Sequence, residues 1–228
     1  MGLVPSKSVL DAANEGRYAI GAFNVNNLEF AKAVIGAAVE ERSPIIVQVS
    51  ESAIAYAGMK QITGIVAGLA GQADVPVSLH LDHGRDWATI VQCIANGFTS
   101  VMIDGSHLPF DENVEITRKV VDVAHAAGVS VEAELGKLAG IEDYVVVDER
   151  DAFLTDPDEA LAFVEKTGVD ALAVAIGTSH GPRKFKGEPV LAIDLVSKIK
   201  AKVGLPLVLH GASGVPAEIM EVGERFGA

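Results

Sequence analysis

The sequence lacks several features that define whole classes of protein. Cys93 is the only cysteine among 228 residues, so no disulfide can form within the chain, and a reducing, cytoplasmic location is expected. No uncharged apolar run reaches the roughly 18 residues that a membrane span requires, and residues 1–7 lack the apolar stretch of a signal peptide. We therefore expect no membrane partner.

Basic residues are also scarce. The chain has 18 Lys and Arg against 31 Asp and Glu, and its formal net charge is −13. Nucleic acids and anionic membranes both require a basic surface, so neither is expected as a partner. With 49% hydrophobic and 21% charged residues, the composition is typical of a globular protein with a substantial core. An anionic substrate would have to be bound locally by backbone N–H groups, a metal ion or a few Lys and Arg.

A repeated strand–helix pattern runs along the chain. Short Val-, Ile-, Leu- and Ala-rich runs alternate with amphipathic segments that end at glycine, which predicts parallel strands joined by crossover helices. The expected strands are 18–25, 45–49, 77–82, 100–104, 129–135, 171–177 and 207–210. The expected helices are 8–16, 28–42, 61–73, 87–96, 112–127, 158–167 and 193–203, with a last one starting near Pro216.

This pattern predicts an α/β fold. Six such units would fit a doubly wound sheet equally well, but seven units with polar residues at nearly every strand end favour a (β/α)₈ TIM barrel. We expect residues 1–228 to be one catalytic barrel domain whose eighth strand and C-terminal helices are not present in this chain. The connection 136–155 is unusually long and acidic, as expected of an active-site lid.

Three histidines share one sequence context. His83, His180 and His210 each lie at the end of an expected strand, and each is followed by glycine. Because strand ends of a barrel meet at one mouth, three imidazoles there can form a catalytic zinc site with an open position for a substrate oxygen. The alternative is three unrelated, hydrogen-bonded histidines.

The other histidines have simpler interpretations. His80 is expected within a strand as a core histidine or a ligand, His107 in a structural turn and His125 on a helix.

Carboxylates accompany the three imidazoles. Asp82 adjoins His83 and could transfer a proton to or from a substrate hydroxyl, although strict alternation would point the two side chains apart unless the strand twists at its end. Asp104, Glu132 and Glu134 are further hard ligands nearby. Glu132 and Glu134 face one side of a strand, so one can approach the metal while the other supports it. Pairing with Lys137 is the structural alternative.

Two segments could bind an anion. The segment 211–216, Gly-Ala-Ser-Gly-Val-Pro, follows a strand and opens a helix, where exposed N–H groups bind phosphate. Gly181 is followed by Arg183, Lys184 and Lys186. Together with the predicted metal ligands, these segments suggest a phosphorylated substrate, although each alone would be an ordinary loop.

Six segments, in order along nearly the whole chain, resemble the class II, metal-dependent fructose-bisphosphate aldolases and the related tagatose-bisphosphate aldolases. The segments are 21–27, 80–84, 97–107, 131–136, 175–181 and 209–214. The 138–143 loop and Thr178–His180 are most similar to the fructose-bisphosphate branch found in thermophilic bacteria.

The resemblance implies a TIM-barrel lyase of glycolysis and gluconeogenesis. It would reversibly cleave fructose 1,6-bisphosphate to dihydroxyacetone phosphate and glyceraldehyde 3-phosphate, and it would assemble as a homodimer or homotetramer. The resemblance also implies Zn²⁺, or Co²⁺, on His83, His180 and His210. A stretch on the eighth strand that completes phosphate binding in the family is not in this chain.

The family's other functional residues also match positions in this sequence. Asp82 corresponds to the acid–base group at the cleaved C3–C4 bond, and Glu142 to the glutamate that transfers a proton at C3. The remaining matched positions are Glu134 with Asp104 for an alternate or second divalent ion, Gly181, Gly211 and Ser213 for phosphate and a monovalent cation (Na⁺ or K⁺), Lys184 near that site, and Asn24, Gln48 and Ser50 for substrate contacts.

Four alternatives stay open at this point. The substrate could be tagatose 1,6-bisphosphate, which differs at one hydroxyl. The same ligands could serve a zinc hydrolase in which Asp82 activates water. Lys137 could act in a Schiff-base aldolase, which borohydride trapping would reveal. The chain could also be a scaffold without activity.

Overall fold

The computed structural model describes residues 2–136, 139–142, 145–147, 153–180, 191–212 and 215. For residues 139–142, 145–147 and 179–180 it describes the backbone alone. The chain forms two compact units. The first comprises Met1–Ala12, Ile20–Asp104 and Lys119–Glu132, and the second comprises Ala13–Ala19, Gly105–Arg118 and Ala133–Ala228.

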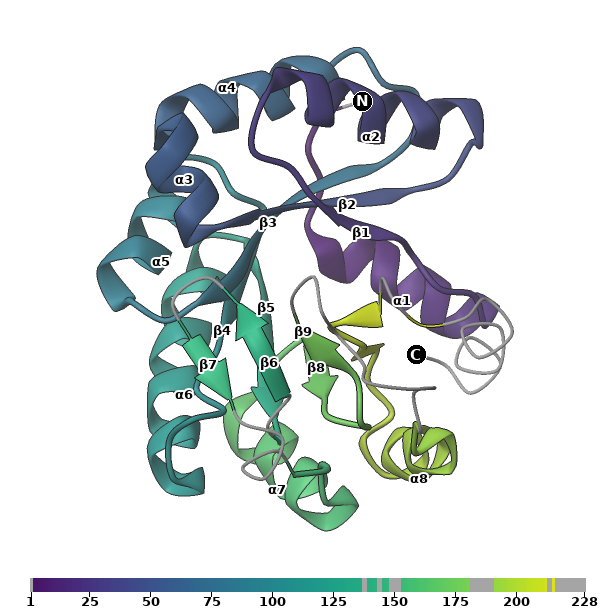
Figure 1. The fold of residues 1–228 in the computed structure, drawn as a ribbon, viewed down its shortest axis with the longest axis vertical. Coiled ribbons are helices and arrows are strands. Elements are labelled where there is room, and N and C mark those ends of the chain that lie inside the picture. The colour runs from purple at the N-terminus through teal and green to yellow at the C-terminus, as the bar shows by residue number, and fades with distance from the viewer. Residues whose placement is uncertain are drawn as a thin grey trace. The chain divides into compact units, whose positions relative to one another are not determined.

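The first unit is a run of parallel strands and helices (Figure 1). Its elements are β1 (Ala22–Asn24), α2 (Leu28–Glu40), β2 (Ile45–Ser50), α3 (Glu51–Ala57), α4 (Met59–Ala70), β3 (Val77–Gly84), α5 (Trp87–Ala95) and β4 (Ser100–Ile103). Three elements are shared between the units: α1 (Ser6–Gly16), α6 (Phe110–Ala126) and β5 (Ser130–Leu135).

The strands of the first unit are hydrogen-bonded in the order β1-β2-β3-β4-β5, and the β1–β2, β2–β3 and β3–β4 pairs are parallel. The order follows the sequence without the reversal that marks a doubly wound sheet. Helices α2 and α4 pack on each other, and they contact β2 and β3 respectively. Polar residues at the ends of neighbouring parallel strands therefore come together, as at the paired residues Ser50 and Asp82.

The second unit continues the alternation. It contains α7 (Pro157–Thr167), β8 (Ala171–Val174), α8 (Ile193–Val203) and β10 (Leu207–Val208), with strand order β5-β8-β10 and a parallel β8–β10 pair. A separate sheet of order β7-β6-β9 is formed by β6 (Ala139–Glu142), β7 (Val145–Val147) and β9 (Ser179–His180). Helix α7 packs against α8.

Buried strands explain the apolar runs of the sequence. All eight residues of β3 are buried, and five of the six residues of β2 are buried. Leu79 and Leu81 of β3 are fully inaccessible to solvent. Strands of a parallel sheet are covered on both faces, so apolar residues predominate in them. Each such leucine stabilises the fold by about 1.5–3 kcal/mol. The polar residues of β3, such as Ser78 and His80, are buried as well.

Local sequence signals define several helix ends. Asn27 caps α2 by accepting a hydrogen bond from the Phe30 backbone N–H, and Asp156 caps α7 in the same way ahead of Pro157. The helix α7 ends at Gly168, whose φ of 71° lies in the left-handed region that favours glycine.

The predicted elements and the observed ones differ in a few places. The expected strand 18–25 is reduced to β1, the expected strand 171–177 to β8, and the expected strand 207–210 to β10. Helix α3 was not predicted. The connection 136–155, expected to lack regular structure, contains the antiparallel β6–β7 pair. The helix expected near Pro216 lies outside the described residues.

Among the described helices, none is by itself long and apolar enough to cross a membrane. Helices α3 and α4 are long and apolar enough only when taken together, and this pair is bent by 96° at the break between them.

Burial of Cys93 predicts an unreactive thiol. Its side chain is fully inaccessible on α5, and this burial, together with the negative charge of Glu51, raises the pKa of the Cys93 thiol to about 12. The Cys93 thiol therefore stays protonated at pH 8. Thiol reagents react with the thiolate form, which is scarcely populated at this pH. We expect no labelling by a thiol reagent at pH 8 in the folded protein and one label per chain in denaturant. Rapid stoichiometric labelling of the folded protein would contradict the burial of Cys93.

Candidate active site

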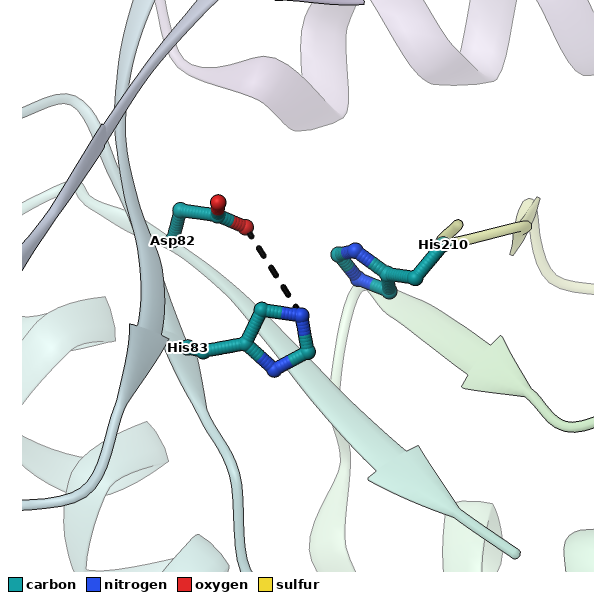
Figure 2. A group of neighbouring side chains, drawn as sticks. All are labelled: Asp82, His83 and His210. Carbon is teal, nitrogen blue, oxygen red and sulfur yellow. Dashed lines mark ion pairs between the residues drawn. The ribbon is translucent and has the colours of Figure 1, made fainter. Parts of the chain in front are cut away.

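Strand β3 ends in Asp82, His83 and Gly84, where the backbone departs from regular strand geometry. His83 has φ 45°, in the left-handed region that residues other than glycine rarely adopt. The register of β3 against β4 also shifts between Leu81 and Gly84. In a regular strand Asp82 and His83 would point to opposite faces. Here their side chains lie on the same side, with Asp82 Oδ1 3.9 Å from His83 Nε2 (Figure 2).

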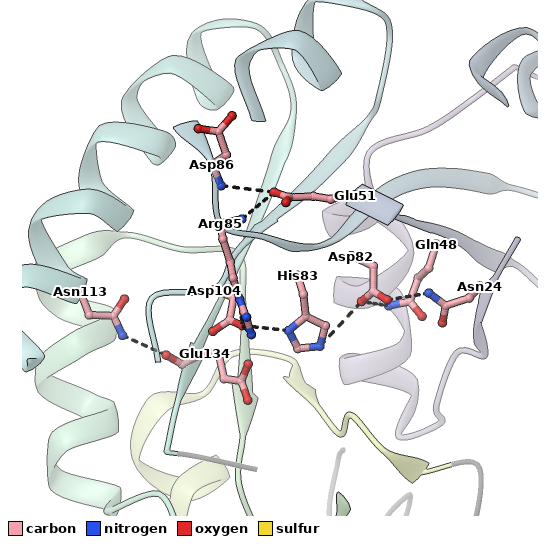
Figure 3. A network of polar contacts seen from close by, with 10 residues as sticks. All are labelled: Asn24, Gln48, Glu51, Asp82, His83, Arg85, Asp86, Asp104, Asn113 and Glu134. Atoms are coloured by element: carbon pink, nitrogen blue, oxygen red, sulfur yellow. Dashed lines mark hydrogen bonds and ion pairs between the residues drawn. The ribbon is translucent and has the colours of Figure 1, made fainter. Parts of the chain in front are cut away.

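Two amide side chains hold the carboxylate of Asp82. Asn24, at the end of β1, donates from Nδ2 to Asp82 Oδ2 at 2.6 Å, and Gln48 on β2 donates from Nε2 to Asp82 Oδ1 at 3.1 Å (Figure 3). Asp82 and Gln48 are buried, whereas Asn24 is exposed. An ionised carboxylate only accepts hydrogen bonds, so one NH₂ donor on each oxygen suits the ionised form of Asp82. The carboxylate is thus held in a fixed position at the strand ends.

A second carboxylate orients the imidazole of His83. Asp104 follows β4, and its Oδ2 lies 3.3 Å from His83 Nδ1. The Asp104 backbone N–H also donates to the Gly84 carbonyl at 2.8 Å. With a carboxylate at Nδ1, that nitrogen carries the proton and Nε2 keeps its lone pair, which is the arrangement of a metal-ligating histidine. Nε2 is also the nitrogen nearer to Asp82.

The second unit contains two further buried residues of the predicted site. Glu134 lies on β5, and its backbone carbonyl accepts a hydrogen bond from Asn113 Nδ2 at 3.1 Å. His210 follows β10 and is buried, and Gly211 after it has φ 69°, which favours glycine.

The donor types present fit a divalent ion. The described residues whose side chains could supply metal ligands are Asp82, His83, Asp104, Glu134 and His210. All five are buried, and imidazole with carboxylate is the donor chemistry of zinc sites. The chain thus carries the ligand types that the sequence predicted for a metal centre.

Several predicted residues lie outside the described side chains. Glu142 belongs to β6 and His180 to β9, and the structure describes only their backbone. Gly181, Lys184 and Ser213 are not among the described residues. Their roles stay predictions.

Ser50 was predicted to contact substrate. Its hydroxyl accepts a hydrogen bond from the Ala53 backbone N–H at 3.3 Å and so caps α3, and it lies 3.0 Å from the Ser52 hydroxyl.

The other histidines agree with structural interpretations. His80 is buried, with Nδ1 2.7 Å from the Ser100 hydroxyl and Nε2 3.7 Å from a carboxylate oxygen of Glu132. His107 lies exposed in a turn, and His125 lies exposed on α6.

Sequence reasoning missed the charged residues that surround the end of β3. Glu51 accepts hydrogen bonds from the Arg85 and Asp86 backbone N–H groups, and Arg85 pairs with Asp104 through its guanidinium (Figure 3). The only signal available was the position of Arg85, directly after a strand end rich in functional side chains.

Comparison with known proteins identifies the family. Residues 4–227 match the family described as Fructose-bisphosphate aldolase class-II. A fructose-bisphosphate aldolase from Thermus caldophilus is 52% identical over 219 residues, covering 96% of this chain and 72% of that protein. One from Helicobacter pylori is 50% identical over 218 residues, covering 95% of this chain and 71% of that protein. The solved structure of the YdjI aldolase from Escherichia coli K12 superposes with a TM-score of 0.87 at 37% identity, over 99% of this chain and 79% of that one. The chain belongs to the class II fructose-bisphosphate aldolase family.

Proposed function

We propose that this chain is a zinc-dependent lyase that reversibly cleaves fructose 1,6-bisphosphate to dihydroxyacetone phosphate and glyceraldehyde 3-phosphate. The observation that carries the proposal is the buried Asp82–His83 pair at the end of β3, in a chain 52% identical to a fructose-bisphosphate aldolase. The similarity to fructose-bisphosphate aldolases indicates the substrate, and the pair supplies an acid–base group beside a metal-ligating imidazole.

We assign the α/β fold of this chain to the (β/α)₈ barrel. Its support is the sequence-following strand order within each unit, β1 to β5 and β5 to β10, and the polar side chains at the ends of β1, β3 and β4. In such barrels the active site lies at the C-terminal ends of the strands.

We assign the metal to His83, His180 and His210, with Glu134 as an alternate ligand. The support is the glycine that follows each histidine, the burial of His83 and His210, and the carboxylate on His83 Nδ1. When bound, zinc or cobalt supplies Lewis-acid stabilisation for negative charge that develops on the ketose oxygens. A second divalent ion at Asp104 and Glu134, and a monovalent cation, stay predictions of the resemblance.

Asp82 is assigned the proton transfer at the cleaved bond. Its carboxylate accepts the proton of the C4 hydroxyl during cleavage and returns it during condensation. Asn24 and Gln48 hold the two oxygens and therefore set the direction from which the hydroxyl is approached. The exposure of Asn24 supports its predicted role as a substrate contact, which stays a prediction.

The remaining roles come from the resemblance. Glu142 transfers the proton at C3 of dihydroxyacetone phosphate. Gly181, Gly211 and Ser213 bind the C1 phosphate, with Lys184 nearby. A homodimer or homotetramer in the cytoplasm stays a prediction of the sequence.

Variants of the adjacent pair should separate metal binding from proton transfer. His83→Ala should abolish zinc binding and activity together. Asp82→Ala should keep zinc and lower kcat by about 10²–10⁴-fold, the usual contribution of a general acid–base group. Zinc content by elemental analysis and cleavage of fructose 1,6-bisphosphate measure the two effects. A fully active Asp82→Ala protein would show that the proton is transferred elsewhere.

An assay on both sugar bisphosphates tests the reaction and its substrate. We expect cleavage of fructose 1,6-bisphosphate that is lost on chelation and restored by zinc. Faster cleavage of tagatose 1,6-bisphosphate would make that sugar the assigned substrate and leave the family unchanged. Hydrolysis of phosphate or amide substrates without aldol cleavage would overturn the lyase proposal.

Gln48→Met tests the support of Asp82. The substitution keeps the side-chain length but removes the donor to Asp82 Oδ1. A hydrogen bond to a charged group contributes about 1.5–3 kcal/mol, so kcat should fall by roughly 10–100-fold while zinc affinity is unchanged. The matched control is Gln92→Met on the exposed face of α5, which should leave kcat unchanged. Equal kcat in the two variants would contradict a role for Gln48 in holding Asp82.

A further inference from the structure

Arg85 makes a two-contact pair with a buried carboxylate of the candidate site. Its Nε lies 3.0 Å and its Nη2 2.6 Å from Asp104 Oδ2 (Figure 3). The Asp104 side chain is 2% exposed, whereas that of Arg85 is 27% exposed. A guanidinium that donates twice to one carboxylate restricts its orientation more than a single contact does.

The same carboxylate oxygen contacts His83. Asp104 Oδ2 lies 3.3 Å from His83 Nδ1, so one oxygen serves both the guanidinium and the imidazole. Rotation of the Asp104 carboxylate away from Arg85 would therefore also change the partner of His83. The guanidinium of Arg85 and the imidazole of His83 are thus linked through a single carboxylate oxygen.

The backbone that carries Arg85 is itself held in place. Glu51 Oε1 accepts hydrogen bonds from the backbone N–H groups of Arg85 at 2.9 Å and Asp86 at 3.2 Å. Asp86 caps α5 by accepting from the Thr89 backbone N–H at 2.9 Å. On the other side, a Cβ added at Gly84 would lie 2.6 Å from the Met102 carbonyl oxygen, so the chain is closely packed there. The backbone before and after Arg85 is therefore held in place.

We propose that Arg85 is a positioning residue, which holds Asp104 as the hydrogen-bond acceptor of His83 Nδ1 and so presents His83 Nε2 to the metal. This inference rests on the proposed function. It also gives Asp104 a role that the sequence did not predict, as the hydrogen-bond partner of His83. A cation bound to Oδ2 would be repelled by the guanidinium on the same oxygen. Through Oδ2, Asp104 therefore acts on the metal by way of His83 and does not itself ligate the ion held by His83 Nε2.

Zinc affinity, measured by competition with a chelator on the full chain, tests the proposal without relying on activity. Loss of a hydrogen-bond partner behind a metal-ligating histidine lowers metal affinity by about 10–100-fold, and we expect Arg85→Met to fall in this range. Arg85→Gln, which keeps one donor for Asp104, should cause a smaller loss. The control is Arg118→Met, an exposed residue of α6 with the same change of charge, which should bind zinc like the parent.

A double-mutant cycle asks whether Arg85 acts through Asp104. Asp104→Ala should weaken zinc binding by itself, and adding Arg85→Met to it should change the affinity by less than about twofold, because the coupled partner is already gone. The visible spectrum of the cobalt-loaded protein should change alike in Arg85→Met and Asp104→Ala and stay unchanged in Arg118→Met. A merely structural role of Arg85 would not couple to Asp104 in this way.

The outcomes distinguish this proposal from the proposed function. If the parent binds zinc, and both Arg85→Met and Arg85→Gln, folded by circular dichroism, bind it equally well, the positioning role is wrong while the lyase assignment is untouched. An equal loss of affinity from Arg85→Met with and without Asp104→Ala would also overturn it. A parent that binds no divalent ion would overturn the proposed function and this inference together.

Discussion

The left-handed backbone at His83 is the constraint on which the candidate site depends. A strand places neighbouring side chains on opposite faces, so an acid–base carboxylate and a ligating imidazole at successive positions cannot serve one site in a regular strand. One residue with φ 45°, together with a register shift against β4, removes this conflict. A left-handed conformation at a residue with a side chain costs about 1–2 kcal/mol, so the surrounding structure must hold it.

The first unit supplies that support from three neighbouring strands. Asn24 and Gln48, from β1 and β2, fix Asp82, and Asp104, beyond β4, fixes His83. Because parallel strands all end at the same edge, one polar residue from each is enough to surround β3 with hydrogen-bond partners. The strained residue is thus held by donors and acceptors that its neighbours in the sheet provide.

The sequence predicted much of this arrangement because parallel strands and metal ligands leave strong local signals. Val-, Ile- and Leu-rich segments marked β2 and β3, and glycine marked the end of α7. The conformation of His83 was anticipated only as a necessary twist, since nothing in Asp-His-Gly specifies a positive φ at the histidine. The β6–β7 pair was missed because the acidic residues of this connection read as a loop, although Val145–Val147 is a β-branched run typical of a strand.

The pairs that complete the site were the least predictable part. Arg85 and Asp104 are 19 positions apart, and Glu51 lies 34 positions before Arg85, so only the fold brings them together. The substrate contacts of Asn24 and Gln48 stay predictions, and the hydrogen bonds that both amides donate to Asp82 were not predicted. Sequence patterns indicated which residues carry chemistry, but not which side chains hold those residues in position.

X-ray absorption at the zinc edge of the metal-loaded protein tests the central claim most directly. The account predicts imidazole nitrogens at about 2.0–2.1 Å from the ion, three of them, with oxygen completing the shell. A shell of oxygen alone, or one that contains sulfur, would contradict a metal centre built on His83, His180 and His210.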